Sequence, residues 1–309
     1  MHREGIQMKS EIFDIYNLYC YGEKSIKDEK GSYLGLTEII LPKLGKAKIQ
    51  IMREYIKNTK SPAFRRTGTL TIELNNEVNE EHSSIAQDIF SLLSFALNGH
   101  IEYREQRDKR SIFRETGMTS NGGWMSIIIN RSGRDICAFI LACWDTYRTQ
   151  KNARRLYETI RLLTQTNESK DFLEQKIALT SVLLESLKHT YGVNNKNYKT
   201  DRTKFYKTPY MKGDEPLTFK AVLMDMIGEV DMPKDFKYDI SYIVKNRNKI
   251  IHEGLLDCST SVMWEQYEAM VSFIRVYLLS LLNFKGRYYS FDQPNVTKSM
   301  GVELLYLQD

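Results

Sequence analysis

The stretch from Lys170 to Thr190 reads KDFLEQKIALTSVLLESLKHT, and its apolar residues recur with the period of an α-helix. The apolar stripe consists of Leu173, Ile177, Leu183, Leu184 and Leu187. A helix with one apolar stripe becomes stable when it buries that stripe against another element. We therefore expect this segment to be a core helix of a larger helical assembly.

Segments with the same helical period flank this stretch on both sides. Two precede it, at residues 135–150 and 152–165, and three follow it, at 217–230, 234–254 and 261–284. Consecutive amphipathic helices of this length are typical of a helical bundle. The sequence therefore predicts an all-α domain over residues 133–309.

The first part of the chain has a different pattern. Short segments rich in β-branched and aromatic residues predict strands at 33–41, 48–56, 68–74 and 124–130. One helix is expected among them, at 81–97, where Asn98 and Gly99 give a stop signal. Residues 1–132 are thus predicted to form a mixed α+β domain. The fold class of the chain is α+β, with this domain followed by the helical bundle.

Composition restricts the class of protein. Hydrophobic residues make up 42% of the 309 residues and charged residues 27%, which is ordinary for a globular protein. The net charge of +5 permits a nucleic-acid partner without requiring one. The longest apolar runs are far shorter than the roughly 20 residues that span a bilayer, and the charged N-terminus does not resemble a signal peptide. We expect a cytoplasmic protein without a membrane partner.

Motifs for metals and cofactors are not found in the sequence. The four cysteines form no CxxC pair, and no histidines are spaced around them as zinc ligands, which indicates buried free thiols. There is no P-loop, no dinucleotide-binding fingerprint and no HExxH motif. We therefore expect neither a metal nor a cofactor.

A basic insertion separates two of the predicted helices. Residues 188–212 carry seven lysines and arginines against a single acidic residue, and five aromatic residues are interleaved with them. Cations that meet phosphates, next to rings that stack on bases, are what a single-stranded RNA surface needs. The candidate RNA-binding residues are Lys196, Lys199, Arg202, Lys204, Tyr206 and Lys207. The alternative, a solvated lysine-rich loop, remains open.

The segment KNRNKIIHEG, from Lys245 to Gly254, holds the strongest candidates for catalysis. Metal-independent RNA cleavage requires a proton to leave the ribose 2′-hydroxyl and another to reach the leaving 5′-oxygen, and imidazole can transfer either one near neutral pH. A guanidinium offers paired donors to the charge that grows on the phosphoryl oxygens. His252, Arg247 and Asn248 together are therefore sufficient for transesterification.

The same segment has a purely structural interpretation. Lysine, arginine and histidine are favoured at a helix C-terminus, where they complement the helix dipole and cap free carbonyls. Arg247 and His252 are five residues apart, about 140° around an ideal helix and about 7.5 Å along it. One chain therefore does not bring the two side chains together unless Arg247 wraps round the helix, and a two-fold partner is another way to complete the cluster.

The run RNKIIH, at the end of a helix in a C-terminal helical domain, resembles the R-x4-6-H motif of the HEPN family. The stretch DFLEQKIALTSVLLESL is similar to the long second core helix of the ApeA-like HEPN proteins, in which a Leu-Glu-x-Leu pattern is common. FILACWDTYRTQKNARRLYETIRLL resembles the helical connector of that group, and IFSLLSFALNGHIEY is similar to a helix-turn-strand in their N-terminal domains.

The resemblance implies a metal-independent endoribonuclease that acts as a homodimer through the HEPN bundle, in a toxin or antiviral abortive-infection system. Arg247 would stabilise the phosphoryl transition state, Asn248 would position it, and His252 would act as general acid or base. Glu185 is a further candidate for orienting Arg247 or His252, or else an exposed helix carboxylate.

The resemblance also implies partners for the chain. It implies an antitoxin or a phage-derived trigger as a partner, with the N-terminal domain as a sensor or regulatory module. Since some members of the family lack activity, a non-catalytic dimerisation module that binds RNA or protein is the alternative.

Overall fold

The computed structural model describes residues 9–20, 22–27, 29, 31–52, 66–105, 126–129, 131–167, 172–201, 204–207, 211, 214–234, 239–253, 258–291 and 297–300. The chain forms two compact units, residues 1–144 and 145–309. The division falls inside helix α3 (Gly133–Gln150) rather than at its start, where the sequence suggested a boundary.

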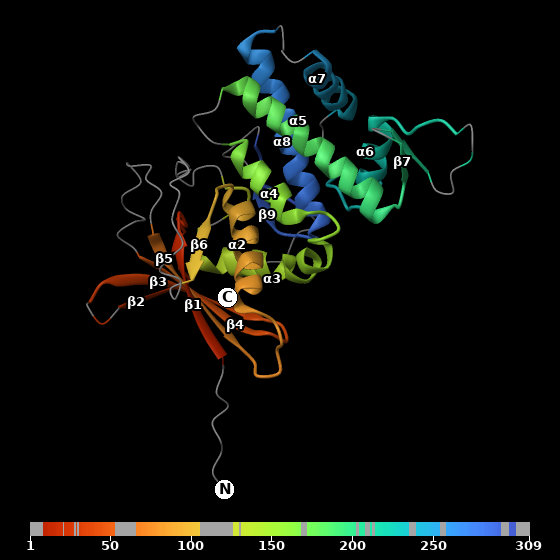
Figure 1. Cartoon of the computed structure of the whole chain (residues 1–309). Helices are drawn as coiled ribbons and strands as arrows, with labels where there is room; N and C mark the ends of the chain where they lie inside the picture. Colours follow the sequence, from red (N-terminus) through yellow and green to blue (C-terminus); the bar gives the residue numbers. More distant parts are fainter. Residues whose placement is uncertain are drawn as a thin grey trace. The chain divides into compact units, whose positions relative to one another are not determined.

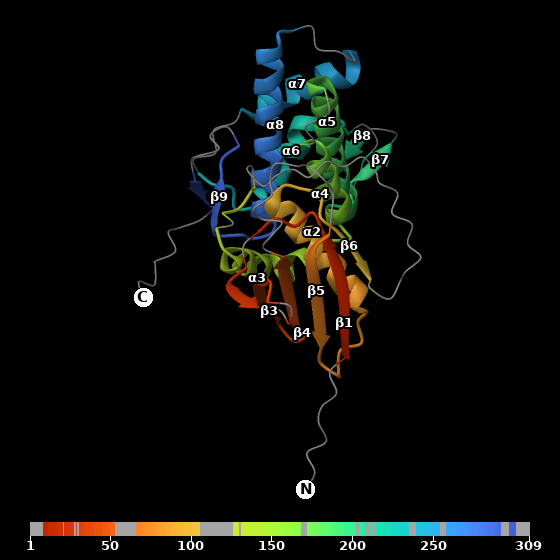
Figure 2. The same ribbon diagram turned by 90° about the vertical axis from the view of Figure 1, so that its left-hand side faces the viewer.

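The first unit contains a six-stranded antiparallel sheet (Figure 2). Its strands are β1 (Lys9–Tyr16), β2 (Lys24–Lys27), β3 (Tyr33–Leu41), β4 (Gly45–Met52), β5 (Arg66–Leu74) and β6 (Glu102–Glu105), in the order β2-β3-β4-β5-β1-β6. The strands predicted at 33–41 and 68–74 correspond to β3 and β5. The one predicted at 48–56 overlaps β4 at residues 48–52, and residues 53–56 lie outside the described residues. The strand pattern predicted neither β1 nor β2, and only the resemblance of residues 89–103 to a helix-turn-strand implied a strand near β6.

The two faces of the sheet differ, because side chains alternate along each strand. On one face the apolar residues of neighbouring strands are buried, among them Phe13, Ile49 and Leu70. Helix α2 (His82–Leu97) contacts β5 and β6. On the other face Glu73 forms ion pairs with Lys46 and Lys48, at 3.0 and 2.8 Å. The sheet thus has one core face and one polar face.

Helix α2 ends where the sequence predicted. Asn98 adopts a left-handed conformation with φ of 52°, and its N–H and that of Gly99 donate to carbonyls of the last turn. The predicted strand at 124–130 is wrong for the described residues 126–129, which make a single bridge and no strand. Ile127 and Ile128 are buried, and both N–H groups donate to the carbonyl of Ala96, so this apolar run packs on the end of α2.

The second unit is built mainly of helices (Figure 1). They are α4 (Leu156–Gln165), α5 (Leu173–Thr190), α6 (Phe219–Gly228), α7 (Ile240–Glu253) and α8 (Thr260–Leu281), with the π-helical turn η1 (Tyr191–Asn195) continuing α5. Two short hairpins accompany them, β7 (Lys199–Asp201) with β8 (Lys204–Tyr206), and β9 (Arg287–Tyr289) with β10 (Thr297–Ser299). The predicted α+β fold class is confirmed.

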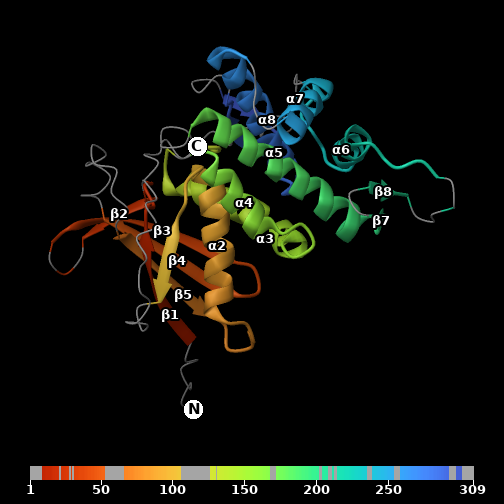
Figure 3. The same ribbon diagram turned by 45° about the horizontal axis from the view of Figure 1, so that its top comes forward.

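The predicted core helix α5 lies at the centre of the second unit. Leu183, Leu184 and Leu187 are fully buried, and α5 packs chiefly against α8, with α4, α6 and α7 around the pair (Figure 3). Arg154, just before α4, is also fully buried. Its guanidinium donates to the hydroxyl of Tyr277 and lies 5.1 Å from the ring centroid of Tyr191.

Candidate functional site

Helix α7 brings Arg247 against α5 and α6 rather than into solvent. Ile243 and Ile250 are buried and fix one side of α7. Arg247 lies between them in sequence, and only 11% of its side chain is exposed. Its guanidinium forms an ion pair with the carboxylate of Glu185 on α5. The structure therefore brings together two of the four candidate catalytic residues from separate helices.

Glu185 holds two cations at once. Its Oε2 is 2.7 Å from the Nζ of Lys188, one turn further along α5, while its other oxygen faces Arg247. Lys188 is buried although lysine usually keeps its ammonium in water. The exposed helix carboxylate considered for Glu185 is thus an inter-helical ion pair, with 29% of its side chain exposed.

Phe219, the first residue of α6, lies beneath both cations. The Cζ of Arg247 is 4.7 Å from its ring centroid, and the Nζ of Lys188 is 5.2 Å from the same centroid. A second ring, Phe205 on β8, lies 5.1 Å from the Lys188 ammonium. The negative faces of these rings partly replace the water that the two cations lose on burial. We name Arg247, Asn248, Glu185, Lys188 and Phe219 the Arg247 cluster.

Asn248 and His252 occupy different environments on α7. The Nη1 of Arg247 donates to the Oδ1 of Asn248 at 2.7 Å, so Asn248 orients the guanidinium from the same helix. His252 is exposed in the last turn and makes no hydrogen bond or ion pair with any residue that the structure describes. Within one chain, therefore, the imidazole does not join the Arg247 cluster.

Burial sets the electrostatics of the cluster. Desolvation lowers the pKa of Arg247 and also that of Lys188, because a low-dielectric environment disfavours the charged forms. Arginine begins from a pKa so high that it keeps its proton at neutral pH. Arg247 therefore remains a permanent, partly desolvated cation, which is the form that stabilises phosphoryl charge most strongly.

The basic insertion folds into η1 and the β7–β8 hairpin, near the end of α5 (Figure 3). Lys199, Lys204 and Lys207 are exposed on or beside this hairpin. Tyr206 is buried, so its ring is not open for stacking in this structure, and Lys196 forms an ion pair with Glu229. Arg202 lies outside the described residues.

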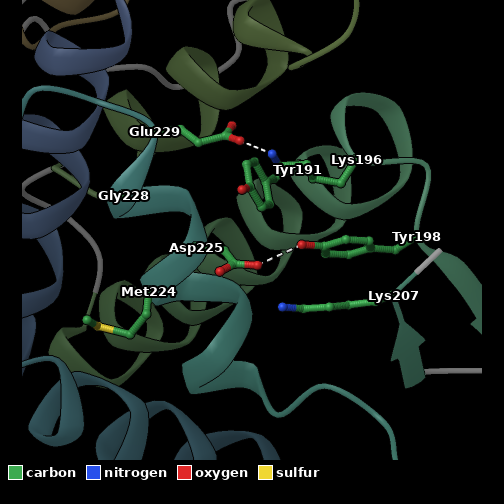
Figure 4. A pocket seen from close by; sticks show the side chains of 8 residues that line it. All are labelled: Tyr191, Lys196, Tyr198, Lys207, Met224, Asp225, Gly228 and Glu229. Atoms are coloured by element: carbon green, nitrogen blue, oxygen red, sulfur yellow. Dashed lines mark hydrogen bonds and ion pairs between the residues drawn. The ribbon is translucent and has the colours of Figure 1, made fainter. Parts of the chain in front are cut away.

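A pocket of about 510 Å³ lies beside the insertion (Figure 4). Its lining comes from η1, the hairpin region and α6, and consists of Tyr191, Lys196, Tyr198, Lys207, Met224, Asp225, Gly228 and Glu229. The hydroxyl of Tyr198 donates to the Oδ2 of Asp225 at 2.7 Å. Desolvation raises the pKa of both Tyr191 and Tyr198, so both phenols keep their protons at physiological pH.

Sequence reasoning missed Phe219, and it assigned Lys188 only to the basic insertion. A usable signal for Phe219 was its place directly after Thr218, whose side chain caps α6 by accepting from the N–H of Ala221. A signal for Lys188 was its spacing of three residues from Glu185 on one helix.

Comparison with known proteins gives no match to a protein-family model, a curated protein or a solved structure. Among the described residues there is no group of three or more potential metal-binding side chains. No helix among the described residues is both long enough and apolar enough to cross a membrane.

Proposed function

We propose that the chain is a metal-independent endoribonuclease of the HEPN type, which cleaves RNA by attack of the ribose 2′-hydroxyl on the neighbouring phosphate. The observation that carries the proposal is the Arg247 cluster. An arginine held by Glu185 and Asn248 offers a desolvated, oriented cation, and His252 follows on the same helix.

In the proposed reaction His252 supplies the proton transfers. The imidazole removes the proton from the 2′-hydroxyl or delivers one to the leaving 5′-oxygen. The 2′-oxygen bonds to phosphorus as the bond to the 5′-oxygen breaks, which leaves a 2′,3′-cyclic phosphate and a 5′-hydroxyl. Arg247 stabilises the charge on the phosphoryl oxygens. Glu185 and Lys188 act as positioning residues.

A homodimer supplies what one chain lacks. His252 is exposed and separated from Arg247 by about 7.5 Å along α7, so a second copy packed in two-fold symmetry adds an imidazole to each cluster. Exposed apolar side chains on α5 and α7, Val182 and Ile251, are candidates for that contact. The proposed context is a cytoplasmic toxin or antiviral effector, with the first unit as the sensor of a trigger or antitoxin.

The test is a digest of transfer and messenger RNA with the purified full chain in the presence of EDTA. We expect products with 2′,3′-cyclic phosphate and 5′-hydroxyl ends, and loss of cleavage in His252→Ala. Glu253→Gln, the exposed neighbouring position, is the matched control and retains cleavage. Cleavage by His252→Ala at the parent rate would overturn the assignment of that residue.

A second candidate function is a non-catalytic module that dimerises and binds RNA or a partner protein. The burial of Arg247 favours this function, because an arginine with a purely structural role would make the same contacts with Glu185 and Asn248. Under this alternative, RNA shifts in a gel assay without any product at high protein concentration.

A further inference from the structure

We propose that the pocket between η1 and α6 binds one nucleobase of a single-stranded RNA together with its phosphate, and that it prefers guanine. The proposal rests on the proposed function for the source of the nucleotide, the substrate strand. The recognition chemistry itself comes from three lining residues, Tyr198, Asp225 and Lys207.

Tyr198 supplies a fixed ring. Its hydroxyl is held by Asp225, and the ring of Tyr191 stands edge-on to it, with centroids 6.4 Å apart and planes at 83°. Because both contacts restrict rotation of the phenol, little side-chain freedom is lost when a base stacks on it. Aromatic stacking of this kind is the usual way in which proteins hold unpaired bases.

Asp225 supplies the base preference. A carboxylate has about four lone-pair positions, and the hydroxyl of Tyr198 uses one of them. The remaining positions can only accept hydrogen bonds, so on a base they select for N–H donors. Guanine presents two adjacent donors on its Watson–Crick edge, N1–H and the N2 amino group, whereas uracil presents a single N–H and adenine and cytosine present an amino group beside an acceptor.

Lys207 supplies the cation for the phosphate. The other lysine of the pocket, Lys196, is neutralised by Glu229 and lies 5.7 Å from the ring centroid of Tyr191. Lys207 is exposed and has no hydrogen bond or ion pair with any described residue. Figure 4 shows its ammonium end pointing from the hairpin region toward α6. Its charge is therefore available to an anionic ligand.

Helix α6 links the pocket to the Arg247 cluster. Phe219 at its start contacts Arg247, and Asp225 follows six residues later, about 9 Å along the helix axis. Phe205 provides a second link. Its ring contacts Lys188, and it also packs on η1 so closely that a Cβ on Gly192 would lie 2.8 Å from the Cε1 of Phe205. Asp225 is about 9 Å along and about 120° around α6 from Phe219, so the base in the pocket and the phosphate at Arg247 would belong to nearby nucleotides of one RNA strand, and cleavage would occur near a guanosine.

The experiment is isothermal titration of the full chain with GMP, AMP, CMP and UMP. We expect GMP to bind about tenfold more tightly than the other three, as one bidentate base contact allows. Asp225→Asn should abolish the preference for GMP. Lys207→Ala should weaken the binding of GMP and leave the affinity for guanosine, which has no phosphate, unchanged. Glu215→Gln, an exposed carboxylate outside the pocket lining, is the control. Thermal melts establish that each variant is folded.

Equal affinities for the four nucleotides, or an unchanged preference in folded Asp225→Asn, would overturn the proposal. His252→Ala should bind GMP like the parent, which separates the two hypotheses. If the chain binds GMP selectively but cuts no RNA, the pocket is a site for a free nucleotide and the nuclease proposal is wrong. If the chain cuts RNA without base preference and does not bind GMP, the guanine site is wrong and the nuclease proposal stands.

Discussion

Arg247 on α7 and Glu185 on α5 form an ion pair across two packed helices, and Lys188 shares the same carboxylate. Three charges thus meet where one carboxylate compensates two cations. The balance is asymmetric, because loss of Arg247 leaves Glu185 paired with Lys188, whereas loss of the Glu185 charge leaves two buried cations without a counter-ion.

Glu185→Gln is therefore expected to destabilise the second unit more than Arg247→Ala does. Breaking a fully buried pair costs roughly 3–5 kcal/mol. Because 29% of the Glu185 side chain is exposed, we expect a loss of about 2 kcal/mol. Urea unfolding monitored by helical circular dichroism measures the difference. A larger loss in Arg247→Ala would show that packing on Phe219, rather than the carboxylate, holds the arginine.

Arg247→Lys separates charge from geometry. The substitution keeps a cation for Glu185, so the stability should change by less than about 1 kcal/mol, but it removes the planar pair of donors that matches phosphate. The proposed nuclease should lose about a hundredfold in cleavage rate, measured on a labelled RNA under single-turnover conditions. Full activity in Arg247→Lys would argue against a transition-state contact by the guanidinium.

Mixing two inactive variants tests whether the proposed site is shared between subunits. Arg247→Ala and His252→Ala each lack one component, so a mixed dimer rebuilds one complete set only if arginine and histidine act across the interface. We expect the mixture, after subunit exchange, to regain part of the parent activity while each variant alone has none. Absence of any recovery in verified mixed dimers would place both residues in the same subunit's site.

Much of the fold is predictable from the sequence, because long helical periods are strong signals. The stripe on α5, from Leu173 to Leu187, predicted a buried helix, and Asn98 predicted the end of α2 by its tolerance of positive φ. The strand predicted at 124–130 was wrong because a short apolar stretch has the same pattern in a strand and in a buried loop. Ile127 packs instead on the end of α2.

The site is less predictable, because its contacts join helices that are far apart in sequence. Arg247 and Glu185 were both candidates, but periodicity alone does not set which faces of α5 and α7 meet. Phe219 shows the same limit, since its role depends on where α6 begins. Tyr206 shows the converse, because an aromatic residue in a basic insertion does not reveal its own burial.

Two buried thiols in the first unit should make its stability depend on alkaline pH. Burial raises the pKa of Cys20 from 9.0 to about 12, and it also raises the pKa of Cys143. Between pH 9 and 12 the unfolded chain has lost the Cys20 proton while the folded chain keeps it, so the free energy of unfolding falls as pH rises.

The slope for Cys20 should approach about 1.4 kcal/mol per pH unit, measured by urea unfolding at several pH values. Cys20→Ala should show a shallower slope than the parent. Native-state alkylation offers an independent check, since neither buried thiol should react until the unit unfolds. An identical slope in Cys20→Ala would assign the alkaline sensitivity to other groups.

Gly45, the first residue of β4, combines a positive φ with a close approach to the neighbouring strand β5. Its φ is +146°, and a Cβ there would lie 2.1 Å from the carbonyl oxygen of Glu73 on the paired strand. Gly31 also has positive φ, +79°, but a Cβ there meets nothing within 4 Å.

Gly31→Ala should therefore cost about 1 kcal/mol for backbone strain alone, and Gly45→Ala at least about 2 kcal/mol more, because β4 and β5 must separate. Urea unfolding of the two variants measures the difference, and equal losses would mean that the β4–β5 pairing relaxes around the added methyl group.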